Sequence, residues 1–256
     1  MPEFLLKVEG TIHTLSTPWV MGILNITPDS FFEGSRFSSA EKAAQRAEEM
    51  IADGAKIIDI GGYSSRPGAD AVSQEEEWQR LESVIPAVRA VVDKHPDTFI
   101  SVDTFRASVA EKAVGAGAHM VNDISGGNLD ERMYEVVAKL QVPYIIMHMQ
   151  GDPSTMQINP TYEHVTQDIV KFFSEKLPQL HAMGIHDTIV DVGFGFGKTL
   201  AHNYQLLREL HAFQLLGRPI LAGVSRKSMI YKPLGTTADE SLNGTSIWSS
   251  IRCKED

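Results

Sequence analysis

Short apolar segments that end in a polar residue recur seven times along the chain, and this repeat constrains the fold more than any other feature. Each segment has the length of one β-strand, and stretches with helical periodicity separate successive segments. We expect strands over residues 19–24, 56–60, 99–102, 119–121, 143–147, 189–192 and 219–224.

Helix starts are marked by two capping boxes, Ser38 with Glu41 and Ser73 with Glu76. The first predicts a helix over 38–52. The second opens a long helix that we expect to kink at Pro86, because proline cannot donate a backbone hydrogen bond. Further helices are expected over 106–115, 129–140 and 204–216, from the loop with Pro153 and Pro160 to about residue 183, and from about residue 239 towards 251.

Buried strands that alternate with amphipathic helices are typical of a parallel sheet. With all helices on one side, seven or eight such units close into a TIM-type (β/α)8 barrel, whereas a doubly wound open sheet is the alternative. A β-hairpin is expected over 4–8 and 11–15, with its turn at Glu9 and Gly10. We therefore predict an α/β protein with one barrel domain over 1–256. Only ten residues follow Ser246, so the eighth β/α unit is missing.

Composition restricts the classes of partner. The chain has 256 residues, 43% hydrophobic, and a net charge of −10, which argues against nucleic acid as a partner because phosphate binding needs a basic face. Cys253 is the single cysteine, which excludes an internal disulfide and fits a reducing compartment. No secretion signal or membrane-spanning run is visible, so we expect a soluble cytoplasmic protein with no membrane partner.

A glycine-rich segment follows one of the expected strands, over residues 188–199, with the sequence T-I-V-D-V-G-F-G-F-G-K-T. It delivers the carboxylate of Asp191 and then alternates glycine with phenylalanine, which lets backbone and flat apolar surface approach a ligand. Val192 stands where a P-loop needs glycine, and G-x-G-x-G is not the dinucleotide fingerprint G-x-G-x-x-G. A glycine-rich turn without a ligand is the alternative interpretation.

Polar side chains stand at all the expected strand ends, where a barrel carries its active site. Each could instead be a helix cap or a turn residue. No nucleophile with a base and no zinc-ligand spacing is present. Inward carboxylates and amides suit a ring rich in N–H donors, and basic loops suit an anionic group, which together indicate a heterocycle joined to a phosphate or carboxylate. The strand-end residues are Asn25, Asp59, Asp103, Asn122, Asp123, His148, Asp191, Ser225 and Lys227, and the basic loop residues are Arg36, Arg66, Arg226 and Lys227.

Seven stretches in order along the chain resemble the dihydropteroate synthase family. They are M-G-I-L-N-I-T-P-D-S-F at 21–31, I-D-I-G-G-Y-S-S-R-P-G-A at 58–69, S-V-D-T at 101–104, V-N-D-I-S-G-G at 121–127, D-V-G-F-G-F-G-K at 191–198, S-R-K-S at 225–228 and E-S-L-N-G-T at 240–245. The resemblance implies condensation of 6-hydroxymethyl-7,8-dihydropterin diphosphate with p-aminobenzoate, which gives 7,8-dihydropteroate and diphosphate in folate biosynthesis.

The resemblance also implies roles for individual residues. Asp103, Asp191 and Lys227 would be catalytic, and Asp59 a supporting carboxylate. Asn25 would bind Mg²⁺ carried by the diphosphate, and the family is commonly a homodimer. The pterin pocket would comprise Asp103, Asn122, Asp191, Gly195, Phe196 and Lys227, the diphosphate site Asn25, Ser65 and Arg66, and the p-aminobenzoate site Phe31, Pro67 and Ser228.

The chain departs from the family pattern at several places. Tyr63 stands where the family often has glutamate, Ser65 where it usually has threonine, and Val192 where proline is usual. Residues 246–256 lack the Arg-x-His pair that holds diphosphate on the family's eighth strand. Two alternatives therefore stand beside the synthase: a truncated, catalytically impaired pterin-binding protein, and a pterin-dependent methyltransferase on the same barrel.

Overall fold

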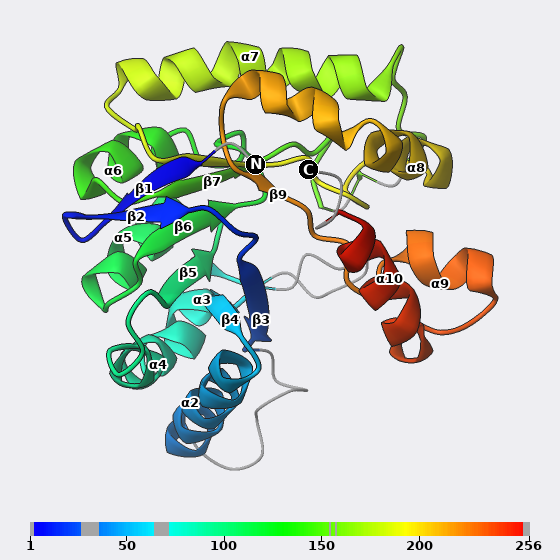
Figure 1. Cartoon of the computed structure of the whole chain (residues 1–256). Helices are drawn as coiled ribbons and strands as arrows, with labels where there is room; N and C mark the ends of the chain where they lie inside the picture. Colours follow the sequence, from blue (N-terminus) through cyan, green and yellow to red (C-terminus); the bar gives the residue numbers. More distant parts are fainter. Residues whose placement is uncertain (1–2, 27–35, 64–71, 154, 157, 253–256) are drawn as a thin grey trace.

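The computed structural model describes residues 3–26, 36–63, 72–153, 155, 156 and 158–252. Its main element is a sheet of seven parallel strands, each paired with the next strand along the chain (Figure 1). All seven lie at or near their predicted positions. They are β3 Val20–Asn25, β4 Ala55–Gly61, β5 Phe99–Asp103, β6 Met120–Asp123, β7 Tyr144–Met147, β8 Thr188–Asp191 and β9 Ile220–Leu221.

Strand order follows chain order without a reversal, and every connection carries at least one helix. A doubly wound sheet reverses its strand order near the middle, so that alternative is excluded. The sheet curls in the manner of a TIM-type barrel. Within the described residues β3 and β9 do not pair with each other, so the barrel stays open between them. The prediction of seven β/α units is confirmed.

The two faces of the sheet carry separate apolar clusters. Ile58 and Ile60 belong to the outer cluster, which packs against the helices, whereas Ile57, Phe99 and Met120 belong to an inner cluster. Successive side chains of a strand point to opposite faces, so Ile57 and Ile58 serve different cores. Helices therefore cover the outer face, and the inner face encloses the interior of the curled sheet.

The predicted N-terminal hairpin is confirmed with the expected bounds, β1 Phe4–Val8 and β2 Thr11–Leu15. Glu9 and Gly10 form its two-residue turn and both have positive φ angles, 47° and 81°, as a type I′ turn requires. Leu6 and Val8 are buried in the inner cluster. The hairpin thus fills the end of the barrel interior where the strands begin, and the opposite end is left for the polar groups.

Helices α2 to α8 flank the sheet along its outer face, whereas α9 and α10 lie to one side of it (Figure 1). Helices along this face pack on each other, for example α2 on α4 and α5 on α6. The helical elements are α2 Arg36–Ala52, α3 Gln74–Leu81, α4 Val84–Val92, α5 Ala107–Gly115, α6 Met133–Leu140, α7 Val165–Ala182, α8 Leu200–Arg208, η1 Leu210–Leu216, α9 Ser228–Leu234, η2 Asp239–Ser241 and α10 Leu242–Arg252.

Several predicted helix boundaries are wrong. Helix α2 begins at Arg36, so Ser38 lies inside it and is not its cap. Helix α6 begins at Met133 rather than 129, because Asp130 accepts hydrogen bonds from the backbone N–H groups of Ala107 and Arg132 and holds a turn. Helix α8 begins at Leu200, four residues before the predicted start.

The predicted cap at Ser73 and the predicted break near Pro86 are both confirmed. The Ser73 side chain accepts from the Glu76 backbone N–H and caps α3. The expected long helix is divided into α3 and α4 at Glu82 and Ser83. Pro86 cannot donate to the carbonyl of Glu82, four residues earlier, which places the interruption there.

Two further differences lie near the carboxyl terminus. Strand β9 has only two residues instead of the predicted six, because it is a sheet edge with β8 as its single described partner. The short helix α9 was not predicted. It begins directly after the loop that carries Lys227, which is its N-cap residue.

Candidate active site

The inner face of the sheet becomes polar towards the carboxyl ends of the strands. Strand register aligns Asn25 with Gly61, Gly61 with Asp103, and Asp103 with Asn122. Gly61 has no side chain, so the side chains of Asn25 and Asp103 flank its position directly. A Cβ atom there would lie 3.6 Å from Asn25 Oδ1 and 3.4 Å from Asp103 Oδ2.

One layer deeper lies Asp59, whose side chain is 4% exposed. Its Oδ2 accepts a hydrogen bond from Asn122 Nδ2 at 3.0 Å. Burial raises the pKa of Asp59 to about 6, and the nearby Asp191 carboxylate adds to the rise. Asp59 therefore orients Asn122 from inside the barrel, and hydrogen bonds from Ser101 and Asn122 oppose the rise in its pKa.

Asp103 and Asp191 are the two carboxylates nearest the rim. Burial raises the pKa of Asp103 well above its usual range, and the negative charges of Asp59, Glu77 and Asp191 contribute. Burial also raises the pKa of Asp191, against the lowering effect of Lys227 and of the Gly193 N–H, which donates to Asp191 Oδ1 at 2.7 Å. Groups that lose solvent beside other carboxylates favour a ligand that supplies N–H donors or positive charge.

Asp123 has a different environment from Asn122, its neighbour in the predicted set. It is completely buried and accepts from the Ser125 N–H and hydroxyl at 2.7 Å, the Gly127 N–H at 2.8 Å and the Tyr144 hydroxyl at 2.7 Å. With its oxygens occupied in this way, Asp123 holds the turn after β6 and is not placed to bind a ligand.

The predicted glycine-rich loop follows β8 and packs on the segment that follows β7. Gly193, Gly195 and Gly197 have φ angles of 70°, 83° and 60°. A Cβ atom at Gly193 would lie 2.0 Å from the carbonyl oxygen of His148, so no other residue fits without displacing the backbone. This close approach explains the first glycine of the motif.

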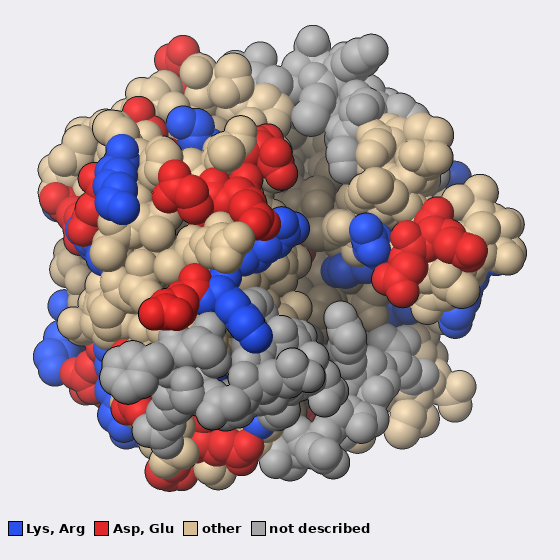
Figure 2. Space-filling view, turned by 90° about the horizontal axis from the view of Figure 1, so that it is seen from below, with Lys and Arg blue, Asp and Glu red and all other residues tan. Residues whose placement is uncertain are grey.

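Lys227 meets this loop from the other side. Its Nζ donates a hydrogen bond to the Phe194 carbonyl and lies 4.9 Å from the centre of the Phe196 ring. Burial lowers the pKa of Lys227, whereas the Asp191 carboxylate opposes that shift. Asp191, Phe196 and Lys227 therefore surround one corner of the barrel mouth. In the space-filling view, a hollow with basic side chains at its border separates the main body from the part that carries α9 and α10 (Figure 2).

Comparison with known proteins identifies the family. The chain matches the family described as pterin binding enzyme over residues 21–254. It is 46% identical over 239 residues to dihydropteroate synthase from Haemophilus influenzae, covering 93% of this chain and 85% of that protein. The chain belongs to the dihydropteroate synthase family.

Solved structures of the family share the fold. A Xanthomonas albilineans dihydropteroate synthase with 4-aminobenzoic acid has 37% identity and a TM-score of 0.88, with 99% of this chain and 90% of that chain covered. A Yersinia pestis dihydropteroate synthase in complex with a sulfonamide drug has 41% identity and a TM-score of 0.86, with 97% and 89% covered. The resemblance inferred from the sequence motifs, and with it the predicted enzyme class, is confirmed.

Several residues predicted from the dihydropteroate synthase pattern cannot be placed. Phe31, Ser65, Arg66 and Pro67 lie outside the described residues. Ser228 is the first residue of α9, directly after Lys227, and is half-buried.

Two residues of the candidate site received no role from the sequence. Lys198, 3% exposed, donates from Nζ to the Phe196 carbonyl at 2.9 Å and the His148 carbonyl at 3.2 Å, and lies 3.1 Å from His148 Nδ1. Burial lowers the pKa of Lys198 to about 7 and that of His148 to about 3. The signal for Lys198 was its place after the third glycine, but nothing in the sequence pairs it with His148.

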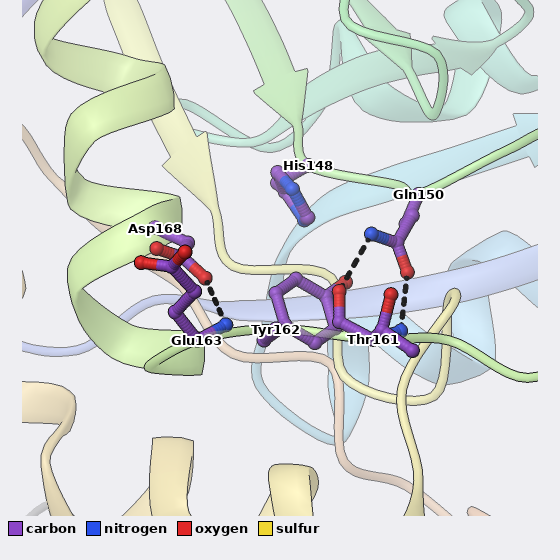
Figure 3. A pocket seen from close by; sticks show the side chains of 6 residues that line it. All are labelled: His148, Gln150, Thr161, Tyr162, Glu163 and Asp168. Atoms are coloured by element: carbon purple, nitrogen blue, oxygen red, sulfur yellow. Dashed lines mark hydrogen bonds between the residues drawn. The ribbon is translucent and has the colours of Figure 1, made fainter.

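A surface cavity of about 480 Å³ is lined on one side by His148 (Figure 3). Gln150 closes one side through hydrogen bonds between its amide and the Thr161 backbone, at 2.9 and 3.0 Å. The lining residues are His148, Gln150, Thr161, Tyr162, Glu163 and Asp168.

None of the helices in the described residues is long and apolar enough to cross a membrane.

Proposed function

We propose that this chain synthesises dihydropteroate at the carboxyl ends of its strands. In this reaction the bond between the pterin methylene carbon and the diphosphate oxygen breaks. A bond from that carbon to the amine nitrogen of p-aminobenzoate forms, and the amine loses a proton. The observation that carries the proposal is the convergence of Asp103, Asn122 and Asp191 at the polar end of the sheet interior.

The pterin ring would lie among these three side chains, against the wall made by Gly195 and Phe196. Carboxylate and amide oxygens accept from the amino and ring N–H groups of the pterin. Phe196 offers a flat apolar surface, and Lys227 stands 4.9 Å from its ring, at the edge of the same pocket. Asp59 lies deeper and supports the site through the hydrogen bond that it accepts from Asn122.

Raised carboxylate pKa values suit a dissociative mechanism. When the diphosphate leaves early, positive charge develops on the pterin methylene and ring. Asp103 and Asp191 form part of a cluster of like charges with little access to solvent, so a positive charge placed there is favoured. The neutral amine then attacks, and no strong protein base is needed, which agrees with the absence of a nucleophile–base pair in the sequence.

The diphosphate would lie at the rim near Asn25, Ser65 and Arg66. Asn25 is exposed at the end of β3 and presents an amide oxygen beside Gly61, with Asp103 on the other side. Oxygen donors of this kind fit Mg²⁺, which commonly uses one or two protein ligands and takes the rest from phosphate and water. Mg²⁺ would arrive with the diphosphate and neutralise its charge.

The p-aminobenzoate site would be formed by Phe31, Pro67 and Ser228. Ser228 supports this placement because it follows Lys227 at the start of α9. We further propose that the chain acts as one pterin-binding domain and forms a homodimer, as the family pattern implies.

Diphosphate release tests the proposal directly. Purified protein is given the pterin diphosphate and Mg²⁺, with and without p-aminobenzoate, and diphosphate is measured over time. We expect release that depends on p-aminobenzoate. A folded protein that binds the pterin without release would instead support the catalytically impaired alternative, for which the open edge between β3 and β9 is the structural argument.

A further inference from the structure

The glycine-rich loop needs an external support to keep one shape. Its three glycines all have positive φ angles, and glycine has the greatest backbone freedom of any residue. The loop nevertheless carries Phe196, whose ring must keep a fixed place if it is to form a wall of the pterin pocket. The side chains that hold the loop therefore matter for binding even when they touch no ligand.

Lys198 supplies the central support. Its Nζ reaches the Phe196 carbonyl, the His148 carbonyl and His148 Nδ1, all within 3.2 Å. The three partners match the three N–H donors of a charged lysine, the form that Lys198 takes below its pKa of about 7. Lys198 is therefore occupied inside the protein and joins the loop after β8 to the end of β7.

His148 is held ready for this contact. Its ring packs against Phe172 at 5.0 Å and Tyr162 at 6.0 Å between ring centres. Its pKa, lowered by burial, keeps the ring neutral, so Nδ1 can accept from the ammonium group of Lys198. The ring and the backbone carbonyl of one residue thus bind the same lysine.

The flanks of the loop are fixed independently. The Tyr162 hydroxyl donates to the Gly197 carbonyl at 2.7 Å, and Asn203 Oδ1 accepts from the Gly195 N–H at 2.7 Å. Between these points, the described contacts to the Phe196 carbonyl come from Lys198. Loss of Lys198 therefore removes the side-chain support of the Phe196 carbonyl and leaves the segment with the Phe196 N–H bond to the Gly193 carbonyl at 3.1 Å and the packing of the ring on the cluster around Met147.

We propose that Lys198 and His148 are positioning residues that hold Phe196 in the conformation that binds the pterin. The inference rests on the proposed function, since it assigns Phe196 to the pterin wall. Neither residue touches the substrate in this account, and both act through the loop.

Hydrogen–deuterium exchange of the ligand-free protein tests the loop itself. Lys198→Met keeps the length and apolar stem of the side chain but removes its donors. We expect faster exchange in the segment 193–197 of this variant and unchanged exchange in Lys171→Met, which alters an exposed lysine of α7. Unchanged exchange in Lys198→Met would overturn the proposal without any substrate and regardless of the enzyme's activity.

Kinetics then separate positioning from a general loss of structure. We expect Lys198→Met to raise the KM for the pterin diphosphate at least about tenfold, because a loosened wall weakens pterin binding, and to leave the KM for p-aminobenzoate within about twofold. His148→Leu should act like Lys198→Met. His148→Gln, which keeps an acceptor, should stay near the parent enzyme. Equal rises in both KM values would overturn the proposal. So would a KM for the pterin diphosphate that is as high in His148→Gln as in His148→Leu.

Discussion

At the scale of single residues, the site concentrates carboxylates in a place that is unfavourable for them. Asp59, Asp103 and Asp191 are all shifted to higher pKa, and in each case burial is the main cause. Such groups lower the stability of the empty protein at neutral pH, and an N–H-rich ligand relieves that cost. This is the expected conflict between stability and function at an active site.

Replacement of Asp59 by asparagine should therefore stabilise the protein. The native pKa of about 6 exceeds the usual 3.8, so the charged form is disfavoured in the folded state above pH 6, and the effect fades as the pH falls towards the unfolded pKa. We expect Asp59→Asn to raise the free energy of unfolding by about 1–3 kcal/mol at about pH 8, and by less at about pH 5. Urea unfolding at both pH values measures this. A destabilised variant, or an equal gain at both values, would contradict it.

Pterin affinity should depend on the protonation of Asp59 as well. The pterin N–H groups favour the ionised carboxylates, so binding should weaken as the pH falls through the Asp59 pKa of about 6. We expect the dissociation constant to rise by up to about tenfold per pH unit below that value. Fluorescence titration between about pH 5 and 8 measures the slope, and Asp59→Asn should show a shallower one. An affinity that does not change over this range would be evidence against ionised carboxylates in the pocket.

At the scale of elements, the glycine-rich loop shows how backbone geometry sets the site. Gly193→Ala adds a Cβ atom that would lie 2.0 Å from the His148 carbonyl oxygen, so the loop must move away from β7. Gly184 has a similar φ of 88°, but a Cβ atom there would have only one contact, with Gln141 Nε2 at 3.8 Å. Gly184→Ala therefore has the backbone strain without the clash.

The pair of variants isolates the close approach. Both should lose about 1–3 kcal/mol of stability from backbone strain, but only Gly193→Ala should also weaken pterin binding, by at least about tenfold. Thermal unfolding and pterin titration measure the two effects. Equal pterin affinities in the two variants would show that contact with His148 does not shape the pocket.

Local signals made many elements predictable from the sequence. The hairpin around Glu9 and Gly10, the cap at Ser73 and the interruption before Pro86 all depend on neighbours in the chain. The start of helix α6 was predicted wrongly because Asp130 accepts a hydrogen bond from the N–H of Ala107, which is distant in sequence. The strand-end residues were predictable since parallel strands end at the same edge of a sheet. The Lys198–His148 contact was not, because fifty positions separate the two residues.

At the scale of the whole molecule, the seven-stranded sheet has two open edges in the described chain. Strand β3 is one of them, and Val20 and Ile23 are 61% and 56% exposed there. Exposed apolar edge strands favour association with other chains. The sequence predicted the seven strands, but not which apolar side chains would be exposed at the β3 edge.

A charge at the β3 edge should reduce this association. We expect Val20→Lys to lower the fraction of associated protein at high concentration, because a lysine at a strand edge opposes pairing. Leu215→Lys, at an 86% exposed leucine of η1 away from the sheet, is the control. Sedimentation velocity over a range of concentrations measures both. If the two variants associate to the same extent as the parent protein, the β3 edge is not the contact.

Pterin binding by Asp191→Ala tests most directly the claim that the inward carboxylates form the pterin pocket. Asp191 lies at the end of β8, between the Gly193 N–H and the charge of Lys227. Calorimetric titration compares the parent protein with Asp191→Ala and with Asp53→Ala, an exposed carboxylate after α2. We predict that Asp191→Ala abolishes measurable binding while Asp53→Ala binds normally. Unchanged affinity in a folded Asp191→Ala protein would remove Asp191 from the pocket and contradict the account.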